Sequence, residues 1–362
     1  MATSLAKLRK EIKNNKLDAI LISSVPNIIY LTNYSGFSKE EREAYLFITK
    51  NEQHILTDGR YTTAVKALIP DFKLIEISPK NPANELLKKI KVKHRIKKLG
   101  IEENNLTYKE YKEISSCFDD LNHFSLTNLR TIKDEKEISK IEKACRLGDE
   151  TFNYILKKIR LGVSEKDVAN KIEFFIKKNG GDLSFPTIVA FGKNSAIPHH
   201  QASDQRLTTK DQVILLDFGV KLDNYCSDMT RTIFFGSANA EFKKMYNTVL
   251  KTQTKAIEML NTKYLIHNTK ASSIDKVARD YIISKGYPSI PHSLGHGVGI
   301  EVHENPHLSP KSKDILKEGM VFSIEPGIYL PNSGGVRIED LVVLEKKGPR
   351  LLTHSLRNLI EL

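Results

Sequence analysis

Acidic residues recur in two apolar segments of the chain, and their number and spacing could hold metal ions. The first segment is expected to turn near 222–223 and the second near 332, so that each forms an antiparallel hairpin in which two acids face each other. Opposed residues lie about 4.5–5.5 Å apart at Cβ, and like charges at that distance destabilise a sheet. Two such pairs would need a cation between them. The pairs are Asp217 with Asp228 and Glu325 with Glu339.

The neighbours of these acids are typical of a protein core. Taken singly, each acid could end a strand, cap a turn or lie on the surface. Leu216 precedes Asp217, however, and Ile324 precedes Glu325, which places the acids in strands that are otherwise apolar. Buried carboxylates without partners cost several kcal/mol each, and a bound cation removes that cost. The four acids together therefore indicate a metal site.

A histidine in a glycine-rich segment is a fifth candidate ligand. His296 lies between Gly295 and Gly297, which would allow the backbone to approach a crowded centre. A lone histidine is more often structural than a ligand. Here His292 and His303 lie within the same twelve residues, and this clustering favours a functional site.

One zinc-protease pattern is set aside. His303-Glu-Asn-Pro-His307 matches H-E-x-x-H, but that motif needs a continuous helix that places both histidines on one face. Pro306 disfavours a helical conformation at Asn305, and Pro310 prevents the helix from continuing.

Four carboxylates and one imidazole make an oxygen-rich ligand set that contains no thiolate. Such a set can hold two divalent ions about 3.5–4 Å apart. The hardness of the ligands favours manganese or cobalt over a purely structural zinc, although zinc and iron also accept these ligands. Two metals that share a water would supply hydroxide at neutral pH and polarise a carbonyl. Hydrolysis of an amide or an ester is the reaction class that this predicts.

Length and composition predict a soluble protein of two domains. The chain has 362 residues, of which 40% are hydrophobic and 28% charged, and it has no apolar run near the ~18 residues that a membrane span needs. Its first residues have the spacing of an amphipathic helix and no apolar core of an export signal. The three cysteines, Cys117, Cys145 and Cys226, have no paired spacing. These features predict a reducing compartment, the cytoplasm.

The net charge of +12 raises the question of nucleic-acid binding. The densest basic run covers 88–98, where Ile90, Val92 and Ile96 are spaced like buried positions and no aromatic residue intervenes. A solvated basic face is the simpler interpretation, so a nucleic-acid partner is not expected.

The order of elements divides the chain into an α/β domain at 1–125, a linker at 126–133 and a second domain at 134–362. In the first domain a helix precedes four apolar segments interpreted as strands, at 18–23, 27–32, 44–49 and 54–57. Within the second domain one order of elements occurs twice: a helix, a helix with a capping box, strands, and then an acidic hairpin. The first helices are expected at 134–160 and about 241–263, and the capping boxes are Ser164-Glu-Lys-Asp167 and Ser272-Ser-Ile-Asp275. A duplicated fold would bring the two hairpins to one central site.

These residues resemble the metallopeptidase family with the pita-bread fold, which includes aminopeptidase P, prolidase and methionine aminopeptidase. The resemblance covers nearly the whole chain. Residues 1–125 are similar to the N-terminal domain of the aminopeptidase P and prolidase branch at Asn27-Ile-Ile-Tyr-Leu-Thr-Asn-Tyr-Ser-Gly and Leu56-Thr-Asp-Gly-Arg-Tyr. The resemblance implies an α/β N-terminal domain followed by a duplicated catalytic domain that acts as a dimer.

The resemblance also implies roles for individual residues. Glu325 would be a proton acceptor as well as a ligand. His199 and His303 would bind the substrate or the tetrahedral oxyanion, His292 would line the pocket for the residue after the cut, and Arg337 would orient Glu339 or bind substrate. The implied metal ligands are Asp217, Asp228, His296, Glu325 and Glu339.

The branch implies cleavage of the bond before proline, in peptides with proline in the second position. Prolidases act on dipeptides and often have an arginine just after the His-Glu-x-Pro segment, where this chain has His307. The difference favours aminopeptidase P, with His307 as a substrate-binding residue and prolidase as the alternative. Two other classes stay open: a scaffold that keeps the fold without catalysis, and a metal-dependent hydrolase of a non-peptide amide.

Overall fold

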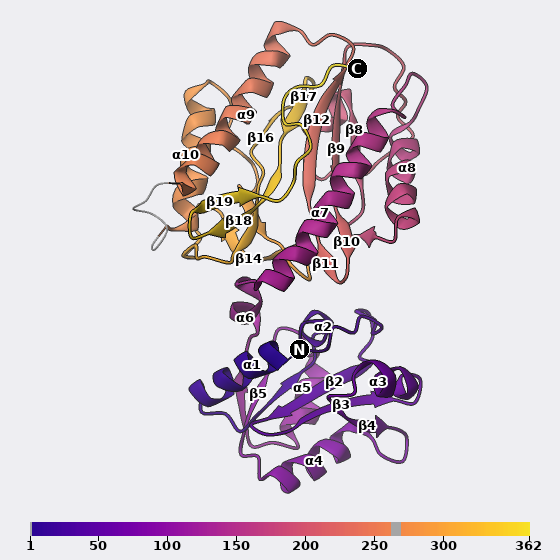
Figure 1. Cartoon of the computed structure of the whole chain (residues 1–362), viewed down its shortest axis with the longest axis vertical. Coiled ribbons are helices and arrows are strands. Elements are labelled where there is room, and N and C mark those ends of the chain that lie inside the picture. The colour runs from indigo at the N-terminus through magenta and orange to yellow at the C-terminus, as the bar shows by residue number, and fades with distance from the viewer. Residues whose placement is uncertain (1, 262–268) are drawn as a thin grey trace. The chain divides into compact units, whose positions relative to one another are not determined.

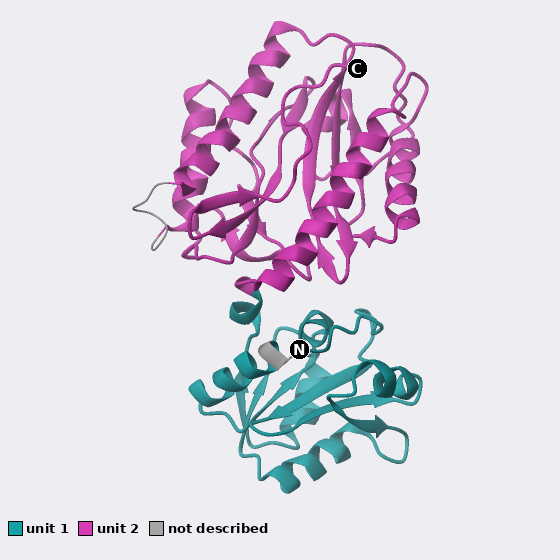
Figure 2. Ribbon diagram, in the orientation of Figure 1, with its two compact units in different colours: residues 1–130 teal, residues 131–362 magenta. Residues whose placement is uncertain are grey.

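The computed structural model describes residues 2–261 and 269–362, and it divides into two compact units, Met1–Arg130 and Thr131–Leu362 (Figure 2). The linker expected at 126–133 contains a short helix, α6 (Thr127–Thr131). Among the helices in the described ranges, none combines the length and apolarity that a membrane crossing requires.

The N-terminal unit is built on one mixed sheet with the strand order β4-β3-β2-β1-β5-β6 (Figure 1). The central strands β1 and β2 are wholly buried, because their side chains are apolar on both faces. The strands are β1 (Ala19–Ile22), β2 (Ala44–Thr49), β3 (Gln53–Asp58), β4 (Lys73–Ile77), β5 (Lys98–Ile101) and β6 (Asp120–His123). The helices are α1 (Ala2–Asn14), α2 (Val25–Thr32), α3 (Thr62–Leu68), α4 (Ala83–His94) and α5 (Tyr108–Ser115).

Two expectations for this unit are corrected. The segment at 27–32, interpreted as a strand, lies in helix α2, whose residues are all buried. A short apolar run does not distinguish a buried helix from a buried strand. The local signals were Pro26 in the first turn and Asn33, which ends the helix in the left-handed conformation. Val92, expected to be buried, is 77% exposed.

The C-terminal unit has two halves of similar construction. In Figure 1 the helices α7 and α8 lie on one side of its strands and α9 and α10 on the other. Each helix pair covers its own apolar core, one in each half. The helices are α7 (Glu135–Leu156), α8 (Glu165–Lys178), α9 (Ala240–Leu260) and α10 (Ala271–Ser284). The last two residues of the helix expected at about 241–263 lie outside the described residues.

The strands of the first half are β7 (Asp182–Leu183), β8 (Ile188–Phe191), β9 (Gln212–Phe218), β10 (Val220–Leu222), β11 (Tyr225–Cys226) and β12 (Met229–Phe235). Those of the second half are β13 (Gly295–Gly297), β14 (Glu304–Leu308), β15 (Val321–Ile324), β16 (Gly327–Leu330), β17 (Gly334–Arg337), β18 (Asp340–Glu345) and β19 (Gly348–Leu351). Of the segment that matched H-E-x-x-H, His303 precedes strand β14 and the other four residues lie in it, so the segment is not helical.

Only one of the two expected capping boxes forms. Ser164 and Asp167 cap α8 reciprocally. Helix α10 instead begins at Ala271, so Asp275 falls inside it and is buried. There its carboxylate accepts hydrogen bonds from the Leu294 backbone N–H and from Arg279, whose guanidinium also donates to the carbonyl of His292. Asp275 therefore supports the histidine-rich segment and does not start the helix.

The first acidic hairpin has a different register from the one expected. Strands β9 and β12 pair so that Asp217 lies opposite Thr230, and Asp228 is displaced by two residues along the same face. Such diagonal neighbours are about 7–8 Å apart. The turn is centred at Asp223-Asn224, both with positive φ, and not at 222–223. This geometry is typical of a type I′ hairpin turn, which Asp and Asn tolerate.

The second hairpin has the expected register. The pairs Ile324 with Asp340 and Gly327 with Arg337 follow one register on the two sides of a gap. Glu325 and Glu339 occupy opposite positions within that gap, where the ladder between β15 and β18 gives way to the ladder between β16 and β17.

A buried arginine joins the two hairpins to the C-terminal segment. Arg231 on β12 forms an ion pair with Asp340, with 2.6 Å between Nη2 and Oδ1, and donates to the backbone carbonyls of Glu339, Ser355 and Leu356. Both charged side chains are almost fully buried. Such a pair contributes less by attraction than by the cost of leaving either partner alone.

We expect Arg231→Leu to destabilise the C-terminal unit by about 3–5 kcal/mol, because Asp340 would lose its cation while it stays buried. Denaturant unfolding followed by circular dichroism measures this loss. The matched control is Lys276→Leu, which breaks the exposed ion pair with Asp280 and should cost less than about 1 kcal/mol. Equal effects of the two substitutions would contradict the role given to Arg231.

Candidate metal centre

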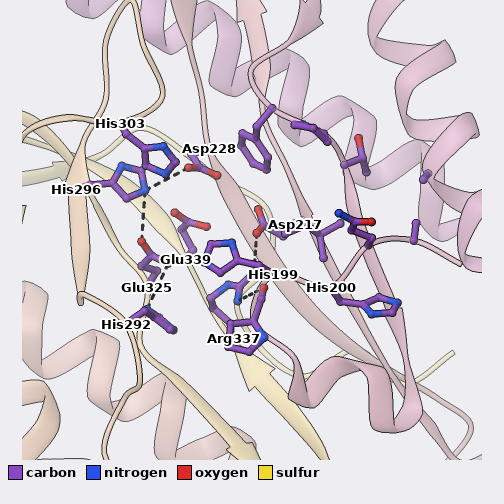
Figure 3. A pocket seen from close by; sticks show the side chains of 18 of the residues that line it. His199, His200, Asp217, Asp228, His292, His296, His303, Glu325, Arg337 and Glu339 are labelled. Carbon is purple, nitrogen blue, oxygen red and sulfur yellow. Dashed lines mark hydrogen bonds and ion pairs between the residues drawn. The ribbon is translucent and has the colours of Figure 1, made fainter. Parts of the chain in front are cut away.

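The two acidic hairpins and the histidine-rich segment line one cavity of about 770 Å³ in the C-terminal unit (Figure 3). Its walls also include apolar side chains of Phe185, Pro186 and Ile188. All the residues singled out from the sequence line this cavity, namely His199, Asp217, Asp228, His292, His296, His303, His307, Glu325, Arg337 and Glu339.

Three of the four acids carry a buried oxygen atom that no hydrogen bond satisfies. These atoms are Asp217 Oδ1, Asp228 Oδ1 and Glu339 Oε1. Glu325 is half-buried at the cavity wall and accepts a hydrogen bond from Ser323 Oγ at 3.3 Å. A buried polar atom without a partner is costly, so three of them in one cavity indicate a binding site for a cation.

His296 presents an unprotonated nitrogen to the acids. Its Nδ1 lies 3.2 Å from the carbonyl of Gly297, to which it donates, so Nε2 keeps its lone pair. Nε2 lies 3.6 Å from Asp228 Oδ2 and 3.4 Å from Glu325 Oε1. Burial lowers the pKa of His296 to about 4, which keeps the ring neutral at pH 7.

Glycines bring this backbone close to its neighbours. A Cβ atom on Gly295 would lie 1.9 Å from the carbonyl oxygen of Ser323, and one on Gly297 would lie 2.1 Å from that of Asn305. No side chain fits at either position, as the sequence indicated.

The acids share a strongly perturbed environment. Burial raises the pKa of Asp228 well above its usual value, and the neighbouring Glu339 carboxylate raises it further. Burial and Glu339 act in the same way on the pKa of Glu325. Burial also raises the pKa of Asp217, although Arg337 opposes the rise. Perturbed acids in a cavity are typical of a functional site.

Arg337 and Thr230 hold two of the acids in place. Arg337 Nη2 donates to Asp217 Oδ2 at 2.6 Å, and its Nε donates to Thr230 Oγ1 at 3.0 Å. Thr230 Oγ1 in turn donates to Glu339 Oε2 at 2.7 Å. Each carboxylate is thereby held by one oxygen and keeps the other free for a cation. Arg337 contacts Asp217 directly and reaches Glu339 only through Thr230.

A directed chain of hydrogen bonds continues from Arg337 to His292. Arg337 Nη1 donates to the Tyr329 hydroxyl at 2.8 Å, which donates to His292 Nε2 at 2.8 Å. His292 Nδ1 donates to the carbonyl of Ser293 at 2.7 Å. Burial lowers the pKa of His292 to about 4, in agreement with this neutral form. Both ring nitrogens of His292 are therefore engaged by protein atoms.

The other histidines divide into two groups. His199, His303 and His307 are exposed at the cavity wall, and the ring centroid of His303 lies 4.4 Å from that of His296. Burial and the nearby His199 lower the pKa of His303. His200 also lines the cavity but points away from the acids (Figure 3), and its Nε2 lies 2.8 Å from Glu165 Oε2. His200 therefore has a structural partner.

The donor set fits a divalent cation. One ligand atom from each of Asp228, His296 and Glu339 lies within 4.8 Å of the others. The separations of His296 Nε2 from Asp228 and from Glu325 match the edge of about 3.3–3.6 Å expected for four ligands placed 2.0–2.2 Å from a metal. Asp217 lies outside this group and faces Arg337.

Sequence patterns did not identify Thr230, Tyr329 and Ser323. Thr230 lies two residues after Asp228, which puts both side chains on one strand face, and this periodicity is the signal that could have found it. Tyr329 and Ser323 show no comparable signal, because their role depends on contacts between segments that are distant in the sequence.

Comparison with known proteins agrees with this architecture. Residues 139–346 match the model of metallopeptidase family M24, and residues 5–132 match the Creatinase/Prolidase N-terminal domain. The chain belongs to metallopeptidase family M24, and the predicted pita-bread fold with its creatinase-type N-terminal domain is confirmed.

Individual relatives match over nearly their full length. The chain is 37% identical to a Xaa-Pro dipeptidase of Pyrococcus horikoshii, over 99% of each chain. The solved Xaa-Pro dipeptidase from Bacillus anthracis is 34% identical, with a TM-score of 0.91 and coverage of 100% of this chain and 99% of that one. The X-Pro aminopeptidase from Thermotoga maritima is also 34% identical, with a TM-score of 0.85 and coverage of 96% and 98%.

We expect manganese ions to raise the thermal midpoint of metal-free protein, and the rise to grow from about pH 5 to about pH 8. Acids whose folded-state pKa lies above the unfolded value stabilise the metal-free fold at low pH. They lose that contribution as the pH rises through the folded pKa. Metal binding needs the deprotonated acids, so the stability that a bound metal adds is largest at high pH. Calorimetry at several pH values measures the rise, and an Asp228→Asn variant should lose it. A rise of the same size at all pH values would contradict the expectation.

We expect Thr230→Val to weaken manganese binding about 10–100-fold, because Glu339 would lose the hydroxyl that orients it. Titration calorimetry measures the dissociation constant. Thr232→Val is the matched control on the same strand, since Thr232 is equally buried but contacts only the backbone of Arg337. A similar loss in both variants would mean that the effect is structural.

Proposed function

We propose that this metallopeptidase hydrolyses the Xaa-Pro bond of dipeptides, as a prolidase. The observation that carries the proposal is the set of unsatisfied buried carboxylate oxygens beside His296 in a cavity large enough for a small peptide. The relatives support the substrate class, since the proteins of Pyrococcus horikoshii and Bacillus anthracis are named as Xaa-Pro dipeptidases. The sequence alone had favoured aminopeptidase P over this alternative.

Two divalent ions are proposed as cofactors, held by Asp217, Asp228, His296, Glu325 and Glu339. Bound there, the ions would polarise the scissile carbonyl and lower the pKa of a water molecule. Manganese is the proposed metal because of the hard oxygen ligands. A cytoplasmic location and a dimeric state stay predictions.

The protein's own residues would divide the remaining work. Glu325 would accept a proton, because its carboxylate lies at the cavity wall 3.4 Å from His296 Nε2, and Ser323 orients it. The neutral, exposed His303 and the neighbouring His199 would hydrogen-bond the substrate carbonyl. Arg337 would act on the ligands and not on the substrate, because its three nitrogens already donate to protein atoms.

A dipeptide substrate presents a proline carboxylate close to the scissile bond. His307 is exposed and lines the same cavity, so its imidazole is the proposed partner of that carboxylate. His307 would thus serve in this chain the role proposed for the arginine that prolidases often have at this position.

Aminopeptidase P is the second candidate. The Thermotoga maritima relative is named as an X-Pro aminopeptidase, and position 307 lacks the arginine expected of prolidases. The two candidates share the metal centre and differ in whether the residue after proline may be extended.

We expect metal-free protein re-supplied with manganese to hydrolyse Gly-Pro faster than Gly-Pro-Gly. Release of glycine is measured for both peptides. His307→Gln should raise KM for Gly-Pro more than for Gly-Pro-Gly, because only the dipeptide places a carboxylate next to the bond that is cut. Asp228→Asn should abolish both activities.

Faster cleavage of the tripeptide would favour aminopeptidase P. Cleavage of neither peptide with any divalent metal would overturn the peptidase proposal in favour of the scaffold. Activity that survives Asp228→Asn would place the catalytic centre elsewhere.

A further inference from the structure

A second group of potential metal ligands lies in the N-terminal unit. Glu52 precedes β3, His54 lies on β3, and His94 is the last residue of α4. We propose that Glu52, His54 and His94 form a separate site for a divalent transition-metal ion such as Zn²⁺. The proposal does not depend on the peptidase function, since all three residues belong to the other unit.

The three side chains converge on one point. Glu52 Oε2 lies 3.2 Å from His54 Nε2 and 3.6 Å from His94 Nε2, and one ligand atom from each of the three residues lies within 4.8 Å of the others. Ligands bound 2.0–2.2 Å from a tetrahedral zinc would be about 3.3–3.6 Å apart. The arrangement matches that geometry about as closely as the centre between the acidic hairpins does.

The ligand atoms are buried and lack hydrogen-bond partners. Glu52 Oε2, both ring nitrogens of His54 and His94 Nε2 are all unsatisfied. His54 is only 3% exposed, so water does not compensate for its unsatisfied nitrogens. An apolar residue would serve a purely structural role at this position at lower cost. A cation coordinated by Glu52 Oε2 and the two Nε2 atoms would satisfy three of these four atoms.

Two lysines contact the Glu52 carboxylate, and one of them would have to move away before a metal ion could bind. Lys73 Nζ lies 2.8 Å from Oε1 of Glu52, the oxygen that faces away from the histidines, and so orients the carboxylate. Lys93 Nζ lies 3.7 Å from Oε2, and its side chain is 63% exposed. Lys93 can therefore move into solvent when a metal ion enters. The C-terminal end of α4 also favours a cation, because unpaired carbonyl groups gather there.

The chemistry of the site would be that of a partly open metal centre. Two imidazoles and one carboxylate suit zinc and other late divalent ions, and leave a coordination position for water. Glu52 and His94 are half-buried, which gives the ion a path from solvent. The bound ion would link the residues at the start of β3 to the end of α4, two elements that are distant in the sequence.

The test is the amount of zinc that the full-length protein binds in equilibrium dialysis against buffered Zn²⁺, measured by mass spectrometry of the metal. We expect His94→Gln and Glu52→Gln each to bind one zinc ion per chain fewer than the wild type. The matched control is His123→Gln, because His123 forms an exposed pair with Glu103 in the same unit and should bind as the wild type does. Equal zinc content in the wild type and His94→Gln would overturn the proposal, as would an equal loss in His123→Gln.

A second variant keeps the proposal testable if the ligand substitutions disturb folding. Lys93→Gln removes a competing cation at an exposed position, so it should tighten zinc binding at this site at least threefold. An unchanged zinc affinity would mean that the group is an ion-pair cluster and not a metal site. Neither measurement uses peptide hydrolysis, so failure of the proposed peptidase function would leave its outcome unaffected.

Discussion

The gathering of four carboxylates around one cavity, three of them buried, is the constraint on which the rest of the C-terminal unit depends. Desolvation and mutual repulsion both oppose it, as the raised pKa values of Asp228 and Glu325 show. The surrounding structure offsets only part of that cost. Arg337 and Thr230 hold one oxygen of Asp217 and of Glu339 and leave the other oxygen unsatisfied. Full satisfaction by protein donors would stabilise the fold more but would leave no place for a cation. The arrangement is therefore a compromise between the stability of the metal-free fold and the capacity to bind metal.

Much of this centre could be predicted because local sequence patterns mark its candidate ligands. An acid after a run of core residues, or a histidine between glycines, is unusual in any sequence, and five such positions converge on one cavity. The duplicated order of helices and hairpins was visible for the same reason. The predictions were wrong where the outcome depends on a shift of one residue in strand register or on contacts between distant segments. Because the turn is centred at Asp223-Asn224, Asp228 does not lie opposite Asp217. Helix α2 is buried on all sides, so its apolar sequence resembled that of a buried strand. The support given by Asp275 and Tyr329 comes from partners far away in the sequence.

The residues proposed to contact the substrate are distinct from the candidate metal ligands in this fold. The ligands and their supports come from strands whose register is set by buried hydrogen bonds. The histidines proposed to meet the substrate, His199, His303 and His307, are exposed at the cavity wall. Substitutions at the wall can change which peptide is held without disturbing the acids beneath it. Two relatives of equal identity, 34% in each case, are named as a dipeptidase and as an aminopeptidase.

The unbroken register of the second hairpin limits how the gene can change. From Val321 to Leu330 and back to Val343, paired positions follow one register even across the gap at Glu325 and Glu339. Side chains alternate between the faces of a strand, so insertion or deletion of a single codon within either strand would turn every later side chain to the opposite face. Glu339 would then leave the cavity together with Arg337. Insertions and deletions among descendants of this gene should therefore concentrate in the turn around Asn332. The strands can accept substitutions but not a change in the number of their residues.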